Sequence, residues 1–97
     1  MKKIRFVLVG AGDRGTTYAE LGAQHCPEFE LVGVADPDPE RRAYIRRLFS
    51  LPEDACFETW ETLFQRPKFA DAAIIATQDR MHVAPAMRAI ELGYQLL

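Results

Sequence analysis

The chain has 97 residues, the size of one small domain. Hydrophobic residues form 48% of it, and twelve Lys and Arg against fourteen Asp and Glu give a formal net charge of −2. This balance offers no basic stripe for nucleic acid, and no apolar stretch approaches the length of a membrane span. Cys26 and Cys56 are far apart, which favours two free thiols in a reducing compartment. We therefore expect a cytoplasmic domain that binds neither nucleic acid nor membrane.

An apolar run near the amino terminus ends in three glycines, Gly10, Gly12 and Gly15, spaced G-x-G-x-x-G. The pattern predicts a buried strand over residues 3–9, then a helix after Gly15 that runs to about His25. In a dinucleotide site the first glycine permits a tight turn, the second lets a pyrophosphate approach the backbone, and the third lets the helix pack on the strand. An ordinary strand–turn–helix corner has the same pattern, so the motif alone leaves both interpretations open.

A second apolar run, residues 30–35, predicts a strand that ends at Asp36. Asp38 and Pro39 then suit the N-cap and the first position of a helix. We expect this helix to turn three apolar side chains inward, namely Ile45, Leu48 and Phe49. We expect its arginines to face largely outward, namely Arg41, Arg42, Arg46 and Arg47.

The second half of the chain continues the alternation of strands and helices. A short strand is predicted over residues 57–59, a short helix capped by Thr59, and a buried strand over residues 71–77. A helix is predicted over residues 80–92, and a further strand begins at Tyr94. Val83, Met87 and Ile90 share one face of that helix. Alternating strands and helices imply an α/β fold, a doubly wound parallel sheet with helices on both faces.

The carboxyl ends of parallel strands lie at one edge of a sheet, where such folds bind ligands. Asp36 ends the second strand, about twenty residues beyond the last glycine, so it can accept hydrogen bonds from ribose hydroxyls. A turn-forming Asp before Pro is the alternative role. A 2′-phosphate at roughly 4 Å from this carboxylate would be repelled, which favours NAD over NADP as cofactor. Arg41 and Arg42 soften that argument, and Arg14 is a candidate to flank the pyrophosphate.

Three blocks of the sequence together are more specific than the glycines alone. They are Gly10–Gly15, Val34–Arg41 and Ile75–His82. With them the whole chain resembles the amino-terminal Rossmann domain of the glucose–fructose oxidoreductase/inositol dehydrogenase/rhizopine-catabolism (Gfo/Idh/MocA) family. The resemblance implies that Ala76 and Thr77 lie against the nicotinamide ribose, and His82 matches the family's histidine after this turn. A backbone-bonded residue in the first turn of a helix is the alternative role for His82.

The chain departs from the family pattern in two places. Gln78 and Asp79 replace the usual Pro and Asn of an Ala-Thr-Pro-Asn turn. The family's Glu-Lys-Pro, whose lysine assists proton transfer, and its carboxy-terminal substrate domain do not occur in these 97 residues. We therefore expect residues 1–97 to be the NAD(P)-binding Rossmann domain of a longer parent, with no catalytic residue and no metal site. This piece would bind the cofactor without turnover.

The resemblance implies that the parent is an oxidoreductase. It would move a hydride between NAD(H) and a secondary alcohol of a sugar or cyclitol, with the sugar-like substrate bound by the other domain. A non-catalytic dinucleotide sensor or regulatory subunit is the first alternative, and the altered turn at Gln78 and Asp79 is its support. A Rossmann-like domain for another nucleotide, such as S-adenosylmethionine, is the second, because Asp36 suits any ribose.

We predict that the 97-residue chain self-associates. Its last predicted strand contains Leu96 and Leu97 and leaves a sheet edge and apolar surface that invite association. Light scattering should report a dimer or a larger species, and the parent should be a homo-oligomer. A monomer that persists at high concentration would contradict the prediction.

Overall fold

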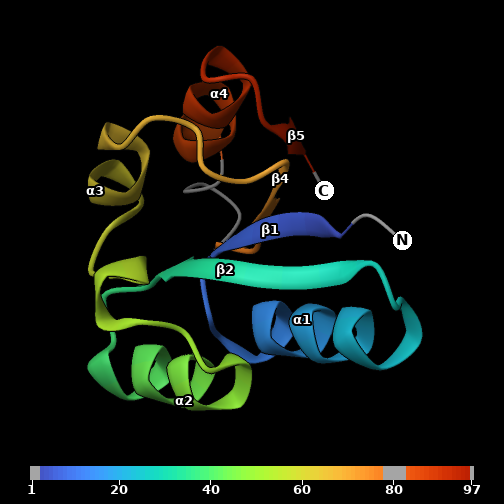
Figure 1. The fold of residues 1–97 in the computed structure, drawn as a ribbon. Helices are drawn as coiled ribbons and strands as arrows, with labels where there is room; N and C mark the ends of the chain where they lie inside the picture. The colour runs from blue at the N-terminus through green and yellow to red at the C-terminus, as the bar shows by residue number, and fades with distance from the viewer. Residues whose placement is uncertain (1–2, 78–82, 97) are drawn as a thin grey trace.

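The computed structural model describes residues 3–77 and 83–96 (Figure 1). The elements in chain order are β1 (Ile4–Val9), α1 (Asp13–His25), β2 (Phe29–Ala35), α2 (Pro39–Phe49), a 3₁₀ turn (Glu53–Ala55), β3 (Cys56–Phe57), α3 (Trp60–Gln65), β4 (Ala72–Ile75), α4 (Val83–Glu91) and β5 (Gln95–Leu96). Within the described ranges, no helix is long and apolar enough to cross a membrane. The alternation of strands and helices is the predicted one.

The five strands form one parallel sheet in the order β3-β2-β1-β4-β5. β1 lies in the centre, where Leu8 is opposite Val34 on one side and Ile74 on the other. The register between β1 and β2 shifts between Phe6 and Val7. In Figure 1, α1 and α2 cover one face of the sheet and α3 and α4 cover the other. This confirms the predicted α/β class with a doubly wound sheet.

Each face of the sheet has its own hydrophobic core, because successive side chains of β1 point to opposite faces. Phe6 and Leu8 belong to the core under α1 and α2, where they are packed with Ile45. Val7 and Val9 belong to the core under α3 and α4. A central strand that is buried on both faces explains the unbroken apolar run that precedes the glycines.

Side chains cap two of the helices as the sequence indicates. Asp38 precedes α2, and its Oδ1 accepts a hydrogen bond of 2.9 Å from the backbone N–H of Glu40. Thr59 precedes α3, and its Oγ1 accepts from the N–H of Thr62 at 3.1 Å. The cap at Asp38 fixes where α2 starts, and therefore which of its side chains reach the adjacent turn.

Several local predictions need correction. α1 begins at Asp13, so Gly15 lies inside its first turn and does not precede it. Leu48 is 45% exposed, because α2 turns Ile45 rather than Leu48 onto the sheet. The third strand is Cys56–Phe57, so it begins one residue before the predicted range of 57–59 and ends before Glu58. Arg42 points inward, since its guanidinium donates to the backbone carbonyl of Asp36 at 2.7 Å.

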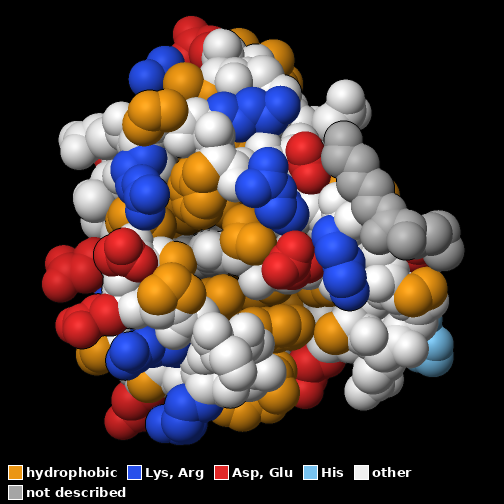
Figure 2. Space-filling model, in the orientation of Figure 1, with side chains coloured by type: hydrophobic (Ala, Val, Ile, Leu, Met, Phe, Trp, Pro, Cys, Tyr) orange, Lys and Arg blue, Asp and Glu red, His pale blue; other side chains and the backbone are white. Residues whose placement is uncertain are grey.

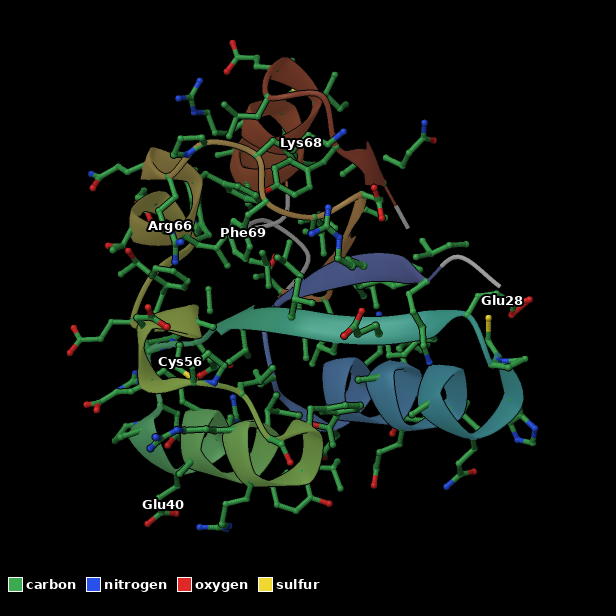
Figure 3. All side chains as sticks on the ribbon, in the orientation of Figure 1. Glu28, Glu40, Cys56, Arg66, Lys68 and Phe69 are labelled. Carbon is green, nitrogen blue, oxygen red and sulfur yellow. The ribbon has the colours of Figure 1, made fainter. Side chains whose placement is uncertain are left out.

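The surface is mixed in character. Figure 2 shows Lys and Arg side chains interspersed with Asp, Glu and hydrophobic groups over the visible face. On α4 three apolar side chains on its outer surface are more than half exposed, namely Val83, Met87 and Ile90. At the end of α3, the Arg66 guanidinium carbon lies 4.9 Å from the centre of the Phe69 ring, and the two residues are close together in Figure 3. Self-association stays a prediction.

The burial difference within α2 gives a direct stability test. Ile45 is fully buried, so Ile45→Ala should lower the free energy of unfolding by about 2–5 kcal/mol. Leu48→Ala removes an exposed side chain from the same helix and should change it by no more than about 0.5 kcal/mol. Urea denaturation followed by circular dichroism measures both. Equal losses would show that α2 packs in another orientation.

Candidate dinucleotide site

The ends of three neighbouring strands meet at one edge of the sheet. The N–H of Gly10 donates to the carbonyl of Ala35 at 2.8 Å, and the N–H of Ala76 donates to the carbonyl of Val9 at 2.8 Å. The turns that follow β1, β2 and β4 are therefore side by side. Gly10, Asp36 and Thr77 come together at this edge as the sequence predicts.

Gly10 and Gly15 are required by the fold itself. Gly10 has a φ of +93°, and a Cβ there would lie 2.8 Å from the carbonyl oxygen of Ala76. A Cβ on Gly15 would collide with the carbonyl oxygen of Gly10. Because neither residue has a Cβ, the start of α1 can approach the end of β1 and the turn after β4. They therefore shape the loop whether or not a ligand is present.

Gly12 differs from the other two glycines. A Cβ there would have only ordinary contacts with described residues, 3.5 Å to Nη1 and 3.7 Å to Cζ of Arg41. Its backbone is extended, with φ at −73°, which any residue adopts. Gly12 is also the N-cap of α1, and no side chain caps the helix there. Packing does not demand a glycine here, and the open space lies at a helix N-terminus that suits an anion.

Asp36 connects the glycine loop to the turn before α2. Its side chain is buried, with 4% of the residue exposed. Oδ2 accepts from the N–H of Ala11 at 2.7 Å, and Oδ1 accepts from the N–H of Asp38 at 2.8 Å. Its own N–H donates to the carbonyl of Phe57 at 3.0 Å. Two carboxylate oxygens have further lone pairs, so ribose hydroxyls remain possible donors to them.

The turn after β4 supplies Ala76 and Thr77. The Oγ1 of Thr77 is buried and has no hydrogen-bond partner among the described residues. A buried hydroxyl without a partner is uncommon and is a place where a ligand group can bind. Gln78, Asp79 and His82 lie outside the described residues, so the roles predicted from the resemblance stay predictions.

A pocket of about 510 Å³ opens beside the glycine loop, between α1 and α2. Acidic side chains dominate the charges that line it, namely Asp13, Glu20, Asp38 and Glu40. Figure 3 shows Glu40 on α2. Arg41 is the cation of this lining and forms an ion pair with Asp38, 3.8 Å between Nε and Oδ2. A phosphate entering this pocket would meet mostly negative charge.

The role of Arg14 beside the pyrophosphate stays a prediction. Arg14 is exposed on the first turn of α1, and the pocket beside the loop is not lined by it. Arg41 reaches the loop instead, from the first turn of α2. In the sequence, the signal that could have pointed to Arg41 is its position close to Asp36. The helix phase that points it toward Gly12 depends on the Asp38 cap.

The described residues offer little for acid–base or metal chemistry. Burial raises the pKa of the Cys56 thiol above its usual value, which outweighs the lowering effect of Arg46 and Arg42. Cys56, the first residue of β3, therefore stays a thiol near neutral pH (Figure 3). Across residues 3–77 and 83–96, no group of His, Cys, Asp and Glu could hold a metal ion.

A parallel sheet with this glycine loop, and with an acidic residue ending the adjacent strand, defines a dinucleotide-binding domain of the Rossmann class. The chain belongs to the Gfo/Idh/MocA oxidoreductase family, described as an oxidoreductase family with an NAD-binding Rossmann fold, whose sequence model matches residues 4–97. This confirms the family resemblance seen in the three sequence blocks.

Solved structures share the fold over nearly the whole chain. The NAD-binding protein from Listeria innocua is 30% identical, with a TM-score of 0.75, over 99% of this chain and 26% of that one. The WlbA dehydrogenase from Bordetella pertussis was solved with NADH and UDP-GlcNAcA. It is 27% identical, with a TM-score of 0.83, over 98% of this chain and 26% of that one.

The scyllo-inositol dehydrogenase from Lactobacillus casei, solved with NAD(H) and scyllo-inositol, has a TM-score of 0.86. At 21% identity, over 98% of this chain and 27% of that one, the likeness shows the fold. The chain thus spans about a quarter of the length of these structures. No curated protein matches it.

The contrast between Gly12 and Gly15 predicts two different defects. Gly12→Ala should fold, and its free energy of unfolding should fall by about 1 kcal/mol or less, because the new Cβ has only ordinary contacts. It should weaken NADH binding at least tenfold, about 1.4 kcal/mol, because the new methyl group would fill the open space at the helix N-terminus. Gly15→Ala should lose about 2 kcal/mol or more of stability through its clash with Gly10.

Thermal melts and NADH fluorescence titrations distinguish the two defects. Normal NADH affinity in Gly12→Ala would show that nothing binds against this glycine. A stable Gly15→Ala protein would show that the loop can relax away from α1.

Proposed function

We propose that this chain is the cofactor-binding domain of an NAD-dependent dehydrogenase. The single observation that carries the proposal is Gly12, an open position at a helix N-terminus where packing does not require a glycine. A backbone position without a Cβ, beside which only the exposed Arg41 side chain lies among the described residues, suits the close approach of a pyrophosphate. The buried Asp36 beside it, and the Thr77 hydroxyl that has no partner among the described residues, fit the two riboses of a dinucleotide.

In this proposal, each part of the site has a role. The loop from Gly10 to Gly15 holds the pyrophosphate, Asp36 accepts the adenosine ribose hydroxyls, and Ala76 and Thr77 contact the nicotinamide ribose. The bound nicotinamide supplies the hydride acceptor or donor. His82 keeps its place as a predicted contact after the β4 turn.

We further propose that the full-length protein acts on a secondary alcohol of a sugar or cyclitol. Family membership supports an oxidoreductase, and the WlbA and inositol dehydrogenase structures were solved with a nucleotide sugar and a cyclitol. The substrate would be bound by a second domain, and residues 1–97 would form the cofactor domain. A full-length form with Glu-Lys-Pro after Leu97 and NAD-dependent oxidation of such an alcohol would support this. Turnover by the 97-residue chain alone would contradict the proposed division of labour.

Asp36 favours NAD over NADP as the cofactor. Its carboxylate is fixed by Ala11 and Asp38, so it cannot turn away from a ligand without breaking two hydrogen bonds. A 2′-phosphate about 4 Å away would be repelled by about 1 kcal/mol per pair of unit charges in water and about 4 at an effective dielectric constant of 20. The acidic pocket between α1 and α2 adds to this repulsion.

Titration of the purified chain tests the proposal. NADH should bind saturably and more tightly than NADPH, and S-adenosylmethionine should not compete. Fluorescence of the nicotinamide gives both dissociation constants directly. Absence of dinucleotide binding would end the proposal, and preferential binding of S-adenosylmethionine would favour the other nucleotide class.

A charge change at Asp36 tests the choice of cofactor. The ratio of the dissociation constant for NADPH to that for NADH measures the preference for NADH. Asp36→Asn should lower this ratio about tenfold, which corresponds to about 1.4 kcal/mol, because it removes one negative charge near the 2′-position. Glu28→Gln removes the same charge just before β2, away from the carboxyl ends of the strands, and should leave the ratio unchanged. A ratio that is equal in all three proteins would show that Asp36 does not face the 2′-position.

A further inference from the structure

Arg42 of α2 holds the backbone at the end of β2. Its Nη1 donates to the carbonyl oxygen of Asp36 at 2.7 Å, so the side chain reaches back across the start of α2 to a residue six positions earlier. Arg42 is half-buried, whereas Arg41 and Arg47 are exposed on the same helix. The Arg42 guanidinium also lies close enough to Cys56 of β3 to lower the pKa of that thiol, although burial outweighs this effect. Arg42 therefore lies between α2 and the edge of the sheet.

The carbonyl that Arg42 holds belongs to a residue that is almost fully buried. Asp36 is 4% exposed, and the next residue, Pro37, has no N–H. The Asp36 N–H donates to the carbonyl of Phe57 at 3.0 Å, and β3 pairs with only the last two residues of β2. A carbonyl oxygen removed from water needs a donor, and Arg42 supplies one by way of its side chain.

The position of this carbonyl affects the carboxylate of the same residue. The peptide group between Asp36 and Pro37 leads directly to Asp38, whose N–H donates to Oδ1 of Asp36 at 2.8 Å. A rotation of that peptide group would displace the N–H of Asp38 and loosen the carboxylate. Arg42 prevents the rotation by holding the carbonyl. A side chain that contacts a ligand keeps its geometry only when the groups behind it are held in this way.

The charge of Arg42 and its positioning effect act in opposite directions on the choice of cofactor. By charge alone, a cation near Asp36 would attract the 2′-phosphate of NADPH. By holding the carboxylate in place, the same residue favours NADH, because a fixed carboxylate accepts ribose hydroxyls and repels a 2′-phosphate. The short bond to the Asp36 carbonyl directs the guanidinium at the backbone, so we expect the positioning effect to prevail.

We propose that Arg42 is a positioning residue for Asp36 and that it thereby strengthens the preference for NADH over NADPH. This inference rests on the proposed dinucleotide function, and it adds to that function a residue that acts through Asp36 rather than by contact with the ligand. The effect is the reverse of the one expected from the sequence, where Arg42 is a nearby cation that softens the argument for NAD.

Two uncharged variants, Arg42→Met and Arg42→Gln, test the proposal. Both lose the bond to the Asp36 carbonyl. Met keeps the length of the side chain and Gln keeps a polar group at a half-buried position, so the test needs only one of them to fold, as melting temperatures establish. Nicotinamide fluorescence titrations should show NADH binding weakened about fivefold and the ratio of the NADPH to the NADH dissociation constant lowered about threefold or more. Arg42→Lys returns a charge and a donor and should recover part of the ratio.

The direction of the change decides between the two effects of Arg42. A ratio that rises in Arg42→Met or Arg42→Gln would show that Arg42 acts by its charge on the 2′-phosphate, and it would overturn the proposal. An unchanged ratio would show that Asp36 keeps its place without Arg42, and it would overturn the proposal too.

Arg46→Met is the matched control. Arg46 lies on the same helix, also lowers the pKa of Cys56, and donates to a backbone carbonyl, that of Leu51, at 3.2 Å. That carbonyl follows the end of α2 and is not part of the turn after β2. Arg46→Met should lower the melting temperature but leave the ratio unchanged. An equal fall of the ratio in Arg46→Met would mean that lost stability, rather than the place of Asp36, changes the selectivity.

A double variant shows whether Arg42 acts through Asp36. In a protein that carries Asp36→Asn, Arg42→Met should no longer lower the ratio, because the carboxylate that Arg42 positions is gone. A further fall of the same size would show that the two residues act independently, and it would overturn the proposal.

The wild-type protein separates this inference from the function on which it rests. If the wild-type protein binds neither NADH nor NADPH, the proposed function fails and the role of Arg42 fails with it. If the wild-type protein prefers NADH and the Arg42 variants keep the same preference, only the inference about Arg42 is wrong.

Discussion

The buried carboxylate of Asp36 is the constraint on which the site depends. Its two oxygens accept hydrogen bonds from Ala11 in the glycine loop and from Asp38 at the start of α2. Its backbone carbonyl accepts from Arg42, and its N–H donates to Phe57 at the end of β3. One residue thus joins the loop after β1, the start of α2 after β2, and the end of β3. Burial of a carboxylate is costly, and two charge-assisted bonds to N–H groups offset that cost only while all these segments keep their places. The edge of the sheet is therefore organised before any ligand arrives.

The three glycines of one motif carry different physical requirements. Gly10 and Gly15 permit close approaches within the protein, which explains why such a motif also occurs in ordinary strand–turn–helix corners. Among the described residues, the atoms near a Cβ on Gly12 are those of the exposed Arg41 guanidinium, at ordinary contact distance. A motif match alone cannot separate a structural glycine from one that leaves room for a ligand. The contacts around each position make that distinction, and here only the middle glycine of the motif is one that packing among the described residues does not require.

Sequence reasoning succeeded where local rules decide the outcome. Buried parallel strands are continuous apolar runs, so β1, β2 and β4 were found, and the caps at Asp38 and Thr59 followed from side-chain chemistry. Leu48 and Arg42 were assigned to the wrong surface because helical periodicity does not reveal which face a neighbouring turn will cover. Arg41 was noted only as a charge near Asp36, since its approach to Gly12 joins two helices far apart in the sequence. The roles of Gln78, Asp79 and His82 came from resemblance alone.

The electrostatics of this edge have opposite effects on different parts of a ligand. The N-terminus of α1 favours an anion, whereas Asp36 and the carboxylates between α1 and α2 disfavour one. Gly12 and the acidic side chains line the same pocket, so the position of each group of a ligand within it decides which influence prevails. A ligand with phosphates confined to the helix end and neutral hydroxyls toward Asp36 satisfies both. An additional phosphate at the ribose would be closer to Asp36 and these carboxylates, which is the basis of the proposed preference for NAD.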